Sequence, residues 1–149
     1  MPRAGDVISV GDLTFNVLSP DRCWNGSHSD PNNDSIVLLL NDGPDSMLFT
    51  GDAEREAQQV LLDTGRLQEV DVLKMPHHAG DTSLPDFFPA VSPEVVAISV
   101  GQPNPYGHPN PTALAEAEAT GADIWRTDDH GTLTITWDDK GEPVVTPQR

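Results

Sequence analysis

The sequence predicts an α/β fold, and three observations lead to this expectation. Short apolar runs that suit buried strands alternate with amphipathic stretches that suit helices along the 149 residues. The 12 glycines and 14 prolines separate these runs as turns. Residues able to bind metal or to catalyse follow directly after strands, where folds of this class place their sites. A chain of this length suits one domain with a real hydrophobic core.

The first predicted element is a β-hairpin, because strands 7–10 and 13–18 flank the turn residues Gly11 and Asp12. A polar loop at 21–34 then leads into a continuous apolar strand at 35–40, as expected for a strand covered on both faces. Further strands are predicted at 47–50, 70–75, 95–100, 122–127 and 132–137, helices at 53–64, 83–90 (capped by Ser83) and 112–120, a turn at 128–131, and a turn and tail at 138–149.

The composition restricts the possible functions. With 24 acidic and 8 basic residues the net charge is −16, which repels phosphate backbones unless metal ions or another domain supply positive charge. The single cysteine, Cys23, excludes an internal disulfide and a multi-cysteine zinc site. No run of eighteen apolar residues and no apolar N-terminal segment occur, so the chain by itself is expected to be soluble.

The first candidate site residue is Asp52, which follows Gly51 at the end of an apolar strand. One interpretation is structural, because an aspartate before a helix can cap the free N–H groups of its first turn. The other is that the exposed carboxylate bridges two metal ions. Gly51 suits the second interpretation, since glycine lets the chain turn sharply and lets a ligand approach closely.

The second candidate is the pair His77 and His78, which follows a buried strand and Pro76. Adjacent side chains usually diverge, so we expect one histidine to bind metal and the other to face the substrate or a supporting partner. Neutral imidazole suits zinc, manganese or iron. A polar loop without further function is the alternative.

The third candidate is the loop 101–111, which is rich in Asn, Pro and Gly. Such a loop is rigid and can hold His108 and Tyr106 over a site as acid/base or oxyanion groups, with Asn104 beside them. These three residues are the catalytic candidates. An ordinary surface loop is the alternative.

Four motifs stand in order along the chain: FTGDAE at 49–54, DVLKMPHHAG at 71–80, VGQPNPYGHP at 100–109 and RTDDHG at 126–131. Together they resemble the metallo-β-lactamase-fold domain at the C-terminal end of ComEC-type DNA-internalisation (competence) proteins, over about residues 5–137. Gly-Asp alone is a weak signal, whereas four motifs in order are a strong one.

This resemblance implies a four-layer αββα sandwich and a two-metal site of zinc or manganese. Asp52 corresponds to the bridging aspartate, and either His77 or His78 to a ligand of the second metal. Asn33 and Ser83 are the implied substrate-binding residues. The usual His-His-Gly-Ser is here His-His-Ala-Gly, so the loop is one residue off the family pattern and Ser83 stands in for its serine. His28 is a weaker candidate ligand before the apolar strand.

The family's main ligand cluster, His-x-His-x-Asp-His, is missing from this sequence. The chain therefore resembles the second half of the domain, as a single partial domain at 1–149 with its core at about 5–137 and a tail at 138–149. Metal binding is expected to be weak or absent in this fragment, because most ligands are missing. An exposed sheet face also favours a homodimer of the fragment.

For the intact parent, the resemblance implies metal-dependent hydrolysis of DNA phosphodiesters during DNA uptake. The parent is expected to be an integral membrane protein that carries this domain outside the cytoplasm, and its remaining segments are the expected partner. The isolated chain is expected to be inactive. The alternatives are a fragment of a soluble hydrolase of the same superfamily and a non-catalytic binding module of that fold.

Overall fold

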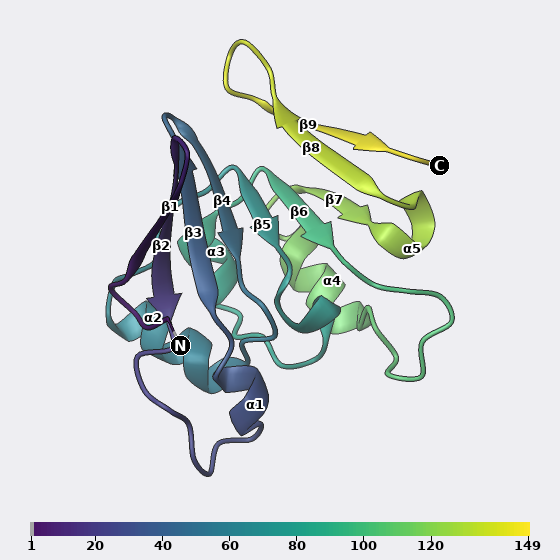
Figure 1. Cartoon of the computed structure of the whole chain (residues 1–149). Coiled ribbons are helices and arrows are strands. Elements are labelled where there is room, and N and C mark those ends of the chain that lie inside the picture. The colour runs from purple at the N-terminus through teal and green to yellow at the C-terminus, as the bar shows by residue number, and fades with distance from the viewer. Residues whose placement is uncertain (1) are drawn as a thin grey trace.

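The computed structural model describes residues 2–149, so the expected domain start at Met1 lies outside the described residues. Seven strands form one sheet in the order of the sequence, and two more form a separate hairpin (Figure 1). The strands of the sheet are β1 (Val7–Val10), β2 (Leu13–Ser19), β3 (Val37–Asp42), β4 (Asp45–Phe49), β5 (Val72–Lys74), β6 (Val95–Ile98) and β7 (Asp123–Arg126). The hairpin consists of β8 (Leu133–Trp137) and β9 (Pro143–Pro147).

The sheet changes from antiparallel to parallel in its middle. Strands β1 to β4 pair antiparallel, whereas β4 to β7 pair parallel. Each parallel connection carries a helix: α2 (Arg55–Asp63), α3 (Phe87–Val91) and α4 (Pro111–Glu118). Because β4, β5 and β6 run parallel and in register, with Phe49 opposite Lys74 and Lys74 opposite Ala97, their carboxyl ends meet at one edge. This edge brings the three candidate segments side by side.

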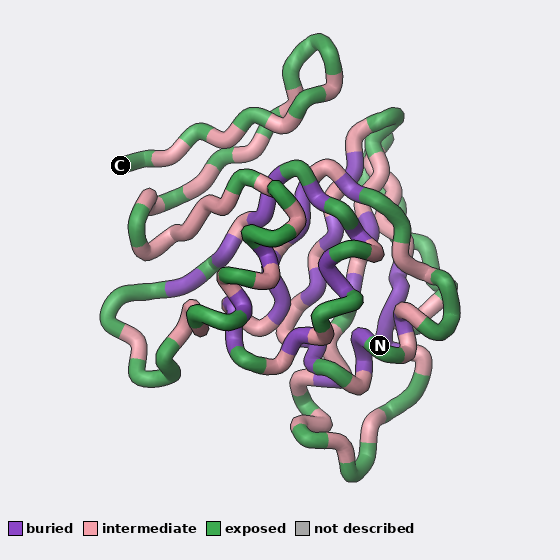
Figure 2. Tube along the Cα trace, turned by 180° about the vertical axis from the view of Figure 1, so that it is seen from behind, coloured by how far each residue is buried: buried purple, intermediate pink, exposed green. Residues whose placement is uncertain are grey.

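The hydrophobic core lies between the helices and one face of the sheet (Figures 1 and 2). The helices contribute small and aromatic side chains that are nearly inaccessible to solvent, and the strands contribute branched residues to the same cluster. Its members include Leu39, Leu48, Ala57, Leu61, Leu73, Phe87, Phe88, Val96, Ala113 and Ala117. The spacing of four residues between Ala57 and Leu61, and between Ala113 and Ala117, places each pair on one helical face.

The opposite face of the sheet is less well covered than the sequence led us to expect. In β3, Val37 and Leu39 are buried, but Leu38 and Leu40 are only partly buried, and Phe49 of β4 is similar. The prediction that the 35–40 strand is covered on both faces is therefore wrong for this chain. A partly open apolar face is what half of a sheet-on-sheet sandwich would leave.

The predicted C-terminal tail is also wrong, since Pro143–Pro147 pairs with β8 as strand β9. The hairpin is tied to the main sheet by Trp137, whose indole Nε1 donates a hydrogen bond to Asp71 Oδ2 at 3.2 Å. In Figure 2 it shows only exposed and intermediate residues, unlike strands β2 to β6 of the main sheet. The segment contributed no signal because Val144 and Val145 are its only branched aliphatic residues.

Two predicted loops contain one-turn helices. The 21–34 loop carries α1 (Asp30–Asn33), and the 128–131 turn is part of α5 (Thr127–His130). Helix α3 begins at Phe87, so Ser83 does not cap it. None of the helices among residues 2–149 has the length and apolar character needed to cross a bilayer.

Candidate metal centre

The turn after β4 presents Asp52 outside the following helix. Gly51 has φ +56°, and an added Cβ would lie 2.9 Å from the Cβ of Ser35, so only glycine suits this position. Ser35 Oγ accepts a hydrogen bond from the Asp52 N–H at 3.0 Å. Helix α2 has Glu54 as its N-cap residue, and the Asp52 carboxylate, 40% exposed, faces Lys74 and His78 instead.

The turn after β5 adopts a strained backbone conformation. His77, His78 and Ala79 have φ values of 44°, 53° and 62°, a region that non-glycine residues rarely occupy. Each such residue costs about 1–3 kcal/mol, which surrounding contacts must offset. The turn is held by hydrogen bonds from His77 N to Gly51 O at 3.2 Å, from Gly80 N to His77 O at 2.8 Å, and from Asn110 N to Ala79 O at 2.7 Å. Its effect is to send the two histidine side chains in different directions.

His78 turns toward Asp52. Its Nδ1 contacts the backbone oxygen of Ser99 at 2.5 Å, and because a carbonyl can only accept, Nδ1 must carry the proton. In the neutral ring this leaves the Nε2 lone pair free, 3.4 Å from Asp52 Oδ1. Two ligands at the usual zinc distances of about 2.0–2.2 Å are about 3.4 Å apart at a tetrahedral angle. The pair therefore has the spacing and the supporting carbonyl of two adjacent metal ligands.

His77 turns to the other side, where its Nδ1 lies 3.0 Å from Thr82 Oγ1 and 3.3 Å from Glu54 Oε1. Its ring meets the ring of His108 edge to face, with the centroids 5.3 Å apart. Gly80 permits this approach, since a Cβ there would lie 2.9 Å from His108 Cε1. His77 is thus held by polar contacts within the chain.

The Glu54 side of Asp52 is a closed polar network. The Glu54 carboxylate is only 3% exposed and lies within 3.3 Å of donors on His28, Asn32 and His77. Its partners satisfy the buried carboxylate without a metal ion. This network joins the 21–34 loop, the start of α2 and the strained turn.

Asn33 belongs to the same side and is fully buried. Its Oδ1 accepts hydrogen bonds from the N–H groups of Glu54 and Ala57 at the start of α2, at 3.2 and 3.1 Å. Its Nδ2 donates to Ser27 Oγ and Glu56 Oε2, so all its hydrogen-bonding groups are engaged. The substrate-binding role of Asn33 stays a prediction, one that this burial disfavours.

Ser83 is likewise buried, and among residues 2–149 its hydroxyl is the buried side-chain group without a hydrogen-bond partner. It lies four residues after Ala79, the last residue of the strained turn, in the segment that leads to α3. Its role in binding substrate also stays a prediction.

The loop between β6 and α4 is braced by Asn104. Its Nδ2 donates to the carbonyls of Gly101 and His108, at 3.0 and 2.8 Å. Its Oδ1 accepts from the N–H groups of Tyr106 and His108, at 3.3 and 3.2 Å. Four hydrogen bonds from one side chain give the loop a fixed shape, so Asn104 positions the other two candidates.

His108 and Tyr106 occupy different environments in this loop. Burial, followed by the neighbouring charges of His77 and His78, lowers the pKa of His108, while Asp52 opposes the shift. His108 is therefore neutral at pH 7 and can accept a proton. Tyr106 is 78% exposed, and its ring stacks on His108 with an interplanar angle of 17°.

Lys74 completes the site and was missed in the sequence. Its Nζ donates to Gly51 O at 2.8 Å and lies 3.9 Å from Asp52 Oδ1. Burial lowers the pKa of Lys74 and the charge of Asp52 opposes this shift. The available signal was a lysine inside an otherwise apolar strand, directly before the histidine pair.

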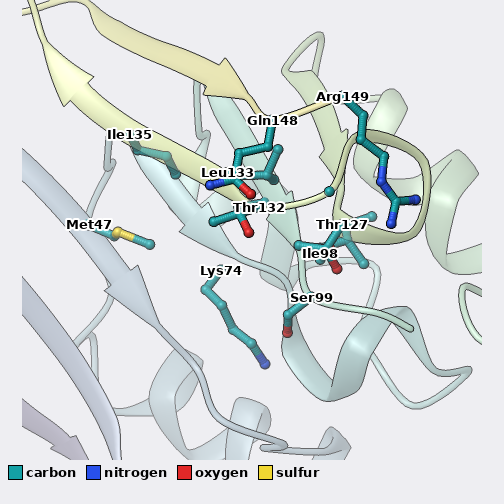
Figure 3. A pocket seen from close by; sticks show the side chains of 12 residues that line it. Met47, Lys74, Ile98, Ser99, Thr127, Thr132, Leu133, Ile135, Gln148 and Arg149 are labelled. Carbon is teal, nitrogen blue, oxygen red and sulfur yellow. The ribbon is translucent and has the colours of Figure 1, made fainter. Parts of the chain in front are cut away.

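A cavity of about 690 Å³ opens between the sheet and the β8–β9 hairpin. Lys74 and Ser99 lie on its sheet side, and Leu133, Ile135 and Gln148 on its hairpin side (Figure 3). The candidate metal-binding edge, which carries Asp52 and His78, is therefore continuous with the open face of the sheet, because Lys74 and Ser99 contact these two residues.

The described residues, 2–149, contain no group of three or more His, Cys, Asp or Glu side chains suited to hold a metal ion. Asp52 and His78 fit two positions of such a site, but two ligands do not form a complete one. The assignment of Asp52 and His78 as metal ligands therefore stays a prediction.

The mixed sheet with helices on one face belongs to a metallo-β-lactamase-like fold. A solved structure described as a metal-dependent hydrolase from Parabacteroides distasonis aligns with it at a TM-score of 0.55 and 13% identity, covering 84% of this chain and 56% of that one. The α/β sandwich prediction, with this chain as part of the fold, is confirmed. No family model matches the sequence.

The chain is a homologue of a segment of the ComEC-type competence proteins. It is 34% identical over 132 residues to ComE operon protein 3 of Bacillus subtilis, covering 88% of this chain. It is 38% identical over 99 residues to Recombination protein 2 of Haemophilus influenzae, covering 66% of this chain. The chain spans only 17% and 12% of the length of these relatives.

Proposed function

We propose that this chain forms part of a metal-dependent nuclease domain in a DNA-uptake protein. The observation that carries the proposal is the pair Asp52 Oδ1 and His78 Nε2, 3.4 Å apart, with His78 oriented by the Ser99 carbonyl. The homology to competence proteins and the hydrolase fold support the reaction class. The intact protein would be a membrane protein with this domain outside the cytoplasm.

The bound metals, zinc or manganese, would supply a nucleophilic hydroxide and polarise the phosphoryl oxygen. Within this chain, Asp52 and His78 would hold metal. Lys74 would balance the charge of Asp52 while no metal is bound. The remaining ligands would come from the part of the domain that this chain does not carry.

His108 would serve as the acid/base group beside the phosphate. Burial lowers its pKa and so favours the neutral imidazole, which can accept a proton. His77 would hold His108 in place through the contact of their rings. Asn104 would fix the loop, and Tyr106 would orient the strand beside the reacting phosphate.

The test compares the full-length product of the gene with residues 1–149 alone, using labelled single-stranded DNA and Mn²⁺. We expect the full-length protein to cleave the DNA, EDTA to abolish cleavage, and the isolated chain to be inactive. Asp52→Asn and His78→Gln should lower the rate at least about 100-fold, because even supporting groups of metal ligands contribute 10–100-fold. Robust metal-dependent cleavage by residues 1–149 would contradict the proposal of a partial site.

A small phosphodiester, bis(p-nitrophenyl) phosphate, serves as the matched substrate in the same assay. Hydrolysis of this compound without cleavage of DNA would favour the alternative of a hydrolase that acts on small substrates. Absence of both activities in the full-length protein would favour a non-catalytic module of the same fold.

A further inference from the structure

Among residues 2–149, the most exposed of the large hydrophobic and aromatic side chains is Tyr106, beside the candidate site. Solvent reaches 78% of it, although an aromatic ring that large is usually at least partly covered in a folded protein. The ring is nevertheless held in one orientation, because it stacks on His108 with the centroids 6.1 Å apart. The Asn104 brace fixes the backbone on both sides of it.

Next to this ring lies a cavity of about 300 Å³ between the loop and the metal-binding edge. The cavity is lined by His78, Ser99, Val100, Gly101, Asn104, Tyr106 and His108, a set without any carboxylate. The cavity on the other side of Asp52 is different, since its lining has three carboxylates, those of Glu54, Glu56 and Asp81, beside Arg55, His28 and Thr82. In a chain of net charge −16, the side with His108 is therefore the one that an anionic strand can approach.

We propose that the ring of Tyr106 stacks against a nucleobase of the single strand whose phosphate lies at Asp52 and His78. This inference rests on the proposed function and names its substrate as unpaired nucleic acid, because a base inside a duplex does not expose its face. Stacking suits this chain, since with few basic residues it cannot rely on phosphate contacts for affinity. Every base has a flat aromatic face, so recognition of this kind tolerates any sequence.

The geometry supports a base rather than a peptide side chain. A cavity of this volume is at the lower end of ligand sites and suits one planar ring system. His78 lines both the cavity and the metal-binding edge, so a base in the cavity has its own phosphate within reach of Asp52. The neutral His108 ring, on which Tyr106 stacks, extends the aromatic surface toward the reacting group.

The test uses Tyr106 as its own reporter, because it is the only tyrosine of the chain and its ring resonances need no further assignment. Residues 1–149 are titrated without metal with oligo(dT) and with an oligonucleotide of the same length that carries abasic sites. We expect oligo(dT) to shift the Tyr106 ring protons upfield and the abasic strand to leave them unchanged. No shift, or equal shifts with both strands, would overturn the inference.

Variants then separate the ring from its hydroxyl. Tyr106→Phe should retain the affinity for oligo(dT), whereas Tyr106→Leu should lose at least about fivefold, the lower limit for one base–aromatic stack. The loss should be the same at low and high salt, since stacking releases no counterions. A loss in Tyr106→Phe equal to that in Tyr106→Leu would contradict stacking, and Val144→Ala, exposed on the hairpin, is the control without effect.

The failure of this inference is distinguishable from failure of the proposed function. The ring shift is read without metal and without cleavage, so an inactive full-length protein that still shows the shift would retain the stacking site. A full-length protein that cleaves DNA equally well with Tyr106→Leu, and shows no shift, would refute only the stacking.

Discussion

The two sides of Asp52 differ in how their polar groups are used. On the Glu54 side, the buried carboxylate of Glu54 and the amide of Asn33 are engaged by partners within the chain. On the His108 side, His78 keeps one nitrogen free and Tyr106 keeps its ring in solvent. The first side is occupied by contacts within the chain, and the second is the side to which we assign metal and substrate in the proposed function.

This difference separates two neighbouring histidines. His77 and His78 are adjacent in sequence and share a strained turn, yet one faces Glu54 and the other faces Asp52. A pair of identical residues therefore contributes one supporting group and one candidate ligand. Residue type alone therefore does not assign a role to a histidine. The contacts of each ring assign it.

The largest expected effect is a loss of folding stability when the hydrogen-bond network around Glu54 is disrupted. Glu54→Ala removes a buried carboxylate and leaves donors on His28, Asn32 and His77 without their partner. We expect the free energy of unfolding to fall by about 2–4 kcal/mol, measured by urea denaturation. His78→Ala, a half-exposed residue, should cost less than about 1 kcal/mol, and a larger loss for His78 than for Glu54 would reverse the comparison.

The next effect tests which histidine binds metal. In residues 1–149 titrated with Mn²⁺, Asp52→Asn and His78→Gln should weaken binding at least about tenfold, measured by paramagnetic broadening of amide resonances. His77→Gln should change binding by less than about threefold, because its Nδ1 is held by Thr82 and Glu54. A greater loss for His77→Gln would assign the ligand to the other histidine.

A smaller effect is expected for the contact between His77, in the turn after β5, and His108, in the loop after β6. Gly80→Ala would place a Cβ 2.9 Å from His108 Cε1 and 3.1 Å from His77 Nδ1, so one ring must move. We expect a loss of stability of about 1–2 kcal/mol and the disappearance of the nuclear Overhauser contacts between His77 and His108. Gly101→Ala is the matched control, since its added Cβ would meet no atom within 4 Å and its φ, like that of Gly80, is not positive.

The smallest effect concerns the protonation of His108. Its pKa is lowered first by burial and then by His77 and His78, so the folded state binds fewer protons than the unfolded state. Stability therefore falls as the pH drops below the ordinary histidine value of about 6.5, and levels off below the folded pKa. His108→Gln should remove part of this loss, as measured by unfolding at several pH values.

The same group gives a sign test by NMR titration. His77→Gln removes a like charge and should raise the pKa of His108, whereas Asp52→Asn removes an opposite charge and should lower it. Shifts in the same direction for both variants would contradict the arrangement of charges around His108.

The order of most elements along the chain, and the meeting of the candidate segments at one sheet edge, followed from the sequence. Apolar runs and their Gly-Asp or His-His endings carry this information locally. The hydrophobic pattern also placed helices 53–64 and 112–120 close to α2 and α4. Strand β9 did not follow, since its residues become a strand only by pairing with β8. Local strand propensity does not show which segment a strand will pair with.

Parts of the candidate site could not be predicted from the sequence either. The amino-acid sequence does not show that three consecutive residues, His77 to Ala79, adopt positive φ values. This conformation depends on hydrogen bonds with Gly51 and Asn110, which lie far away in the sequence. For the same reason the divergence of the histidines was expected but its direction was not. The burial of Asn33 and the approach of Lys74 to Asp52 depend on segments far apart in the sequence.

The most direct test of the central claim is a crystal structure of residues 1–149 soaked in a high concentration of Mn²⁺, with anomalous scattering measured. The account predicts a manganese peak within ligand distance of Asp52 Oδ1 and His78 Nε2, and none at Glu54 and His77. A peak between Glu54, His28 and His77 would contradict it.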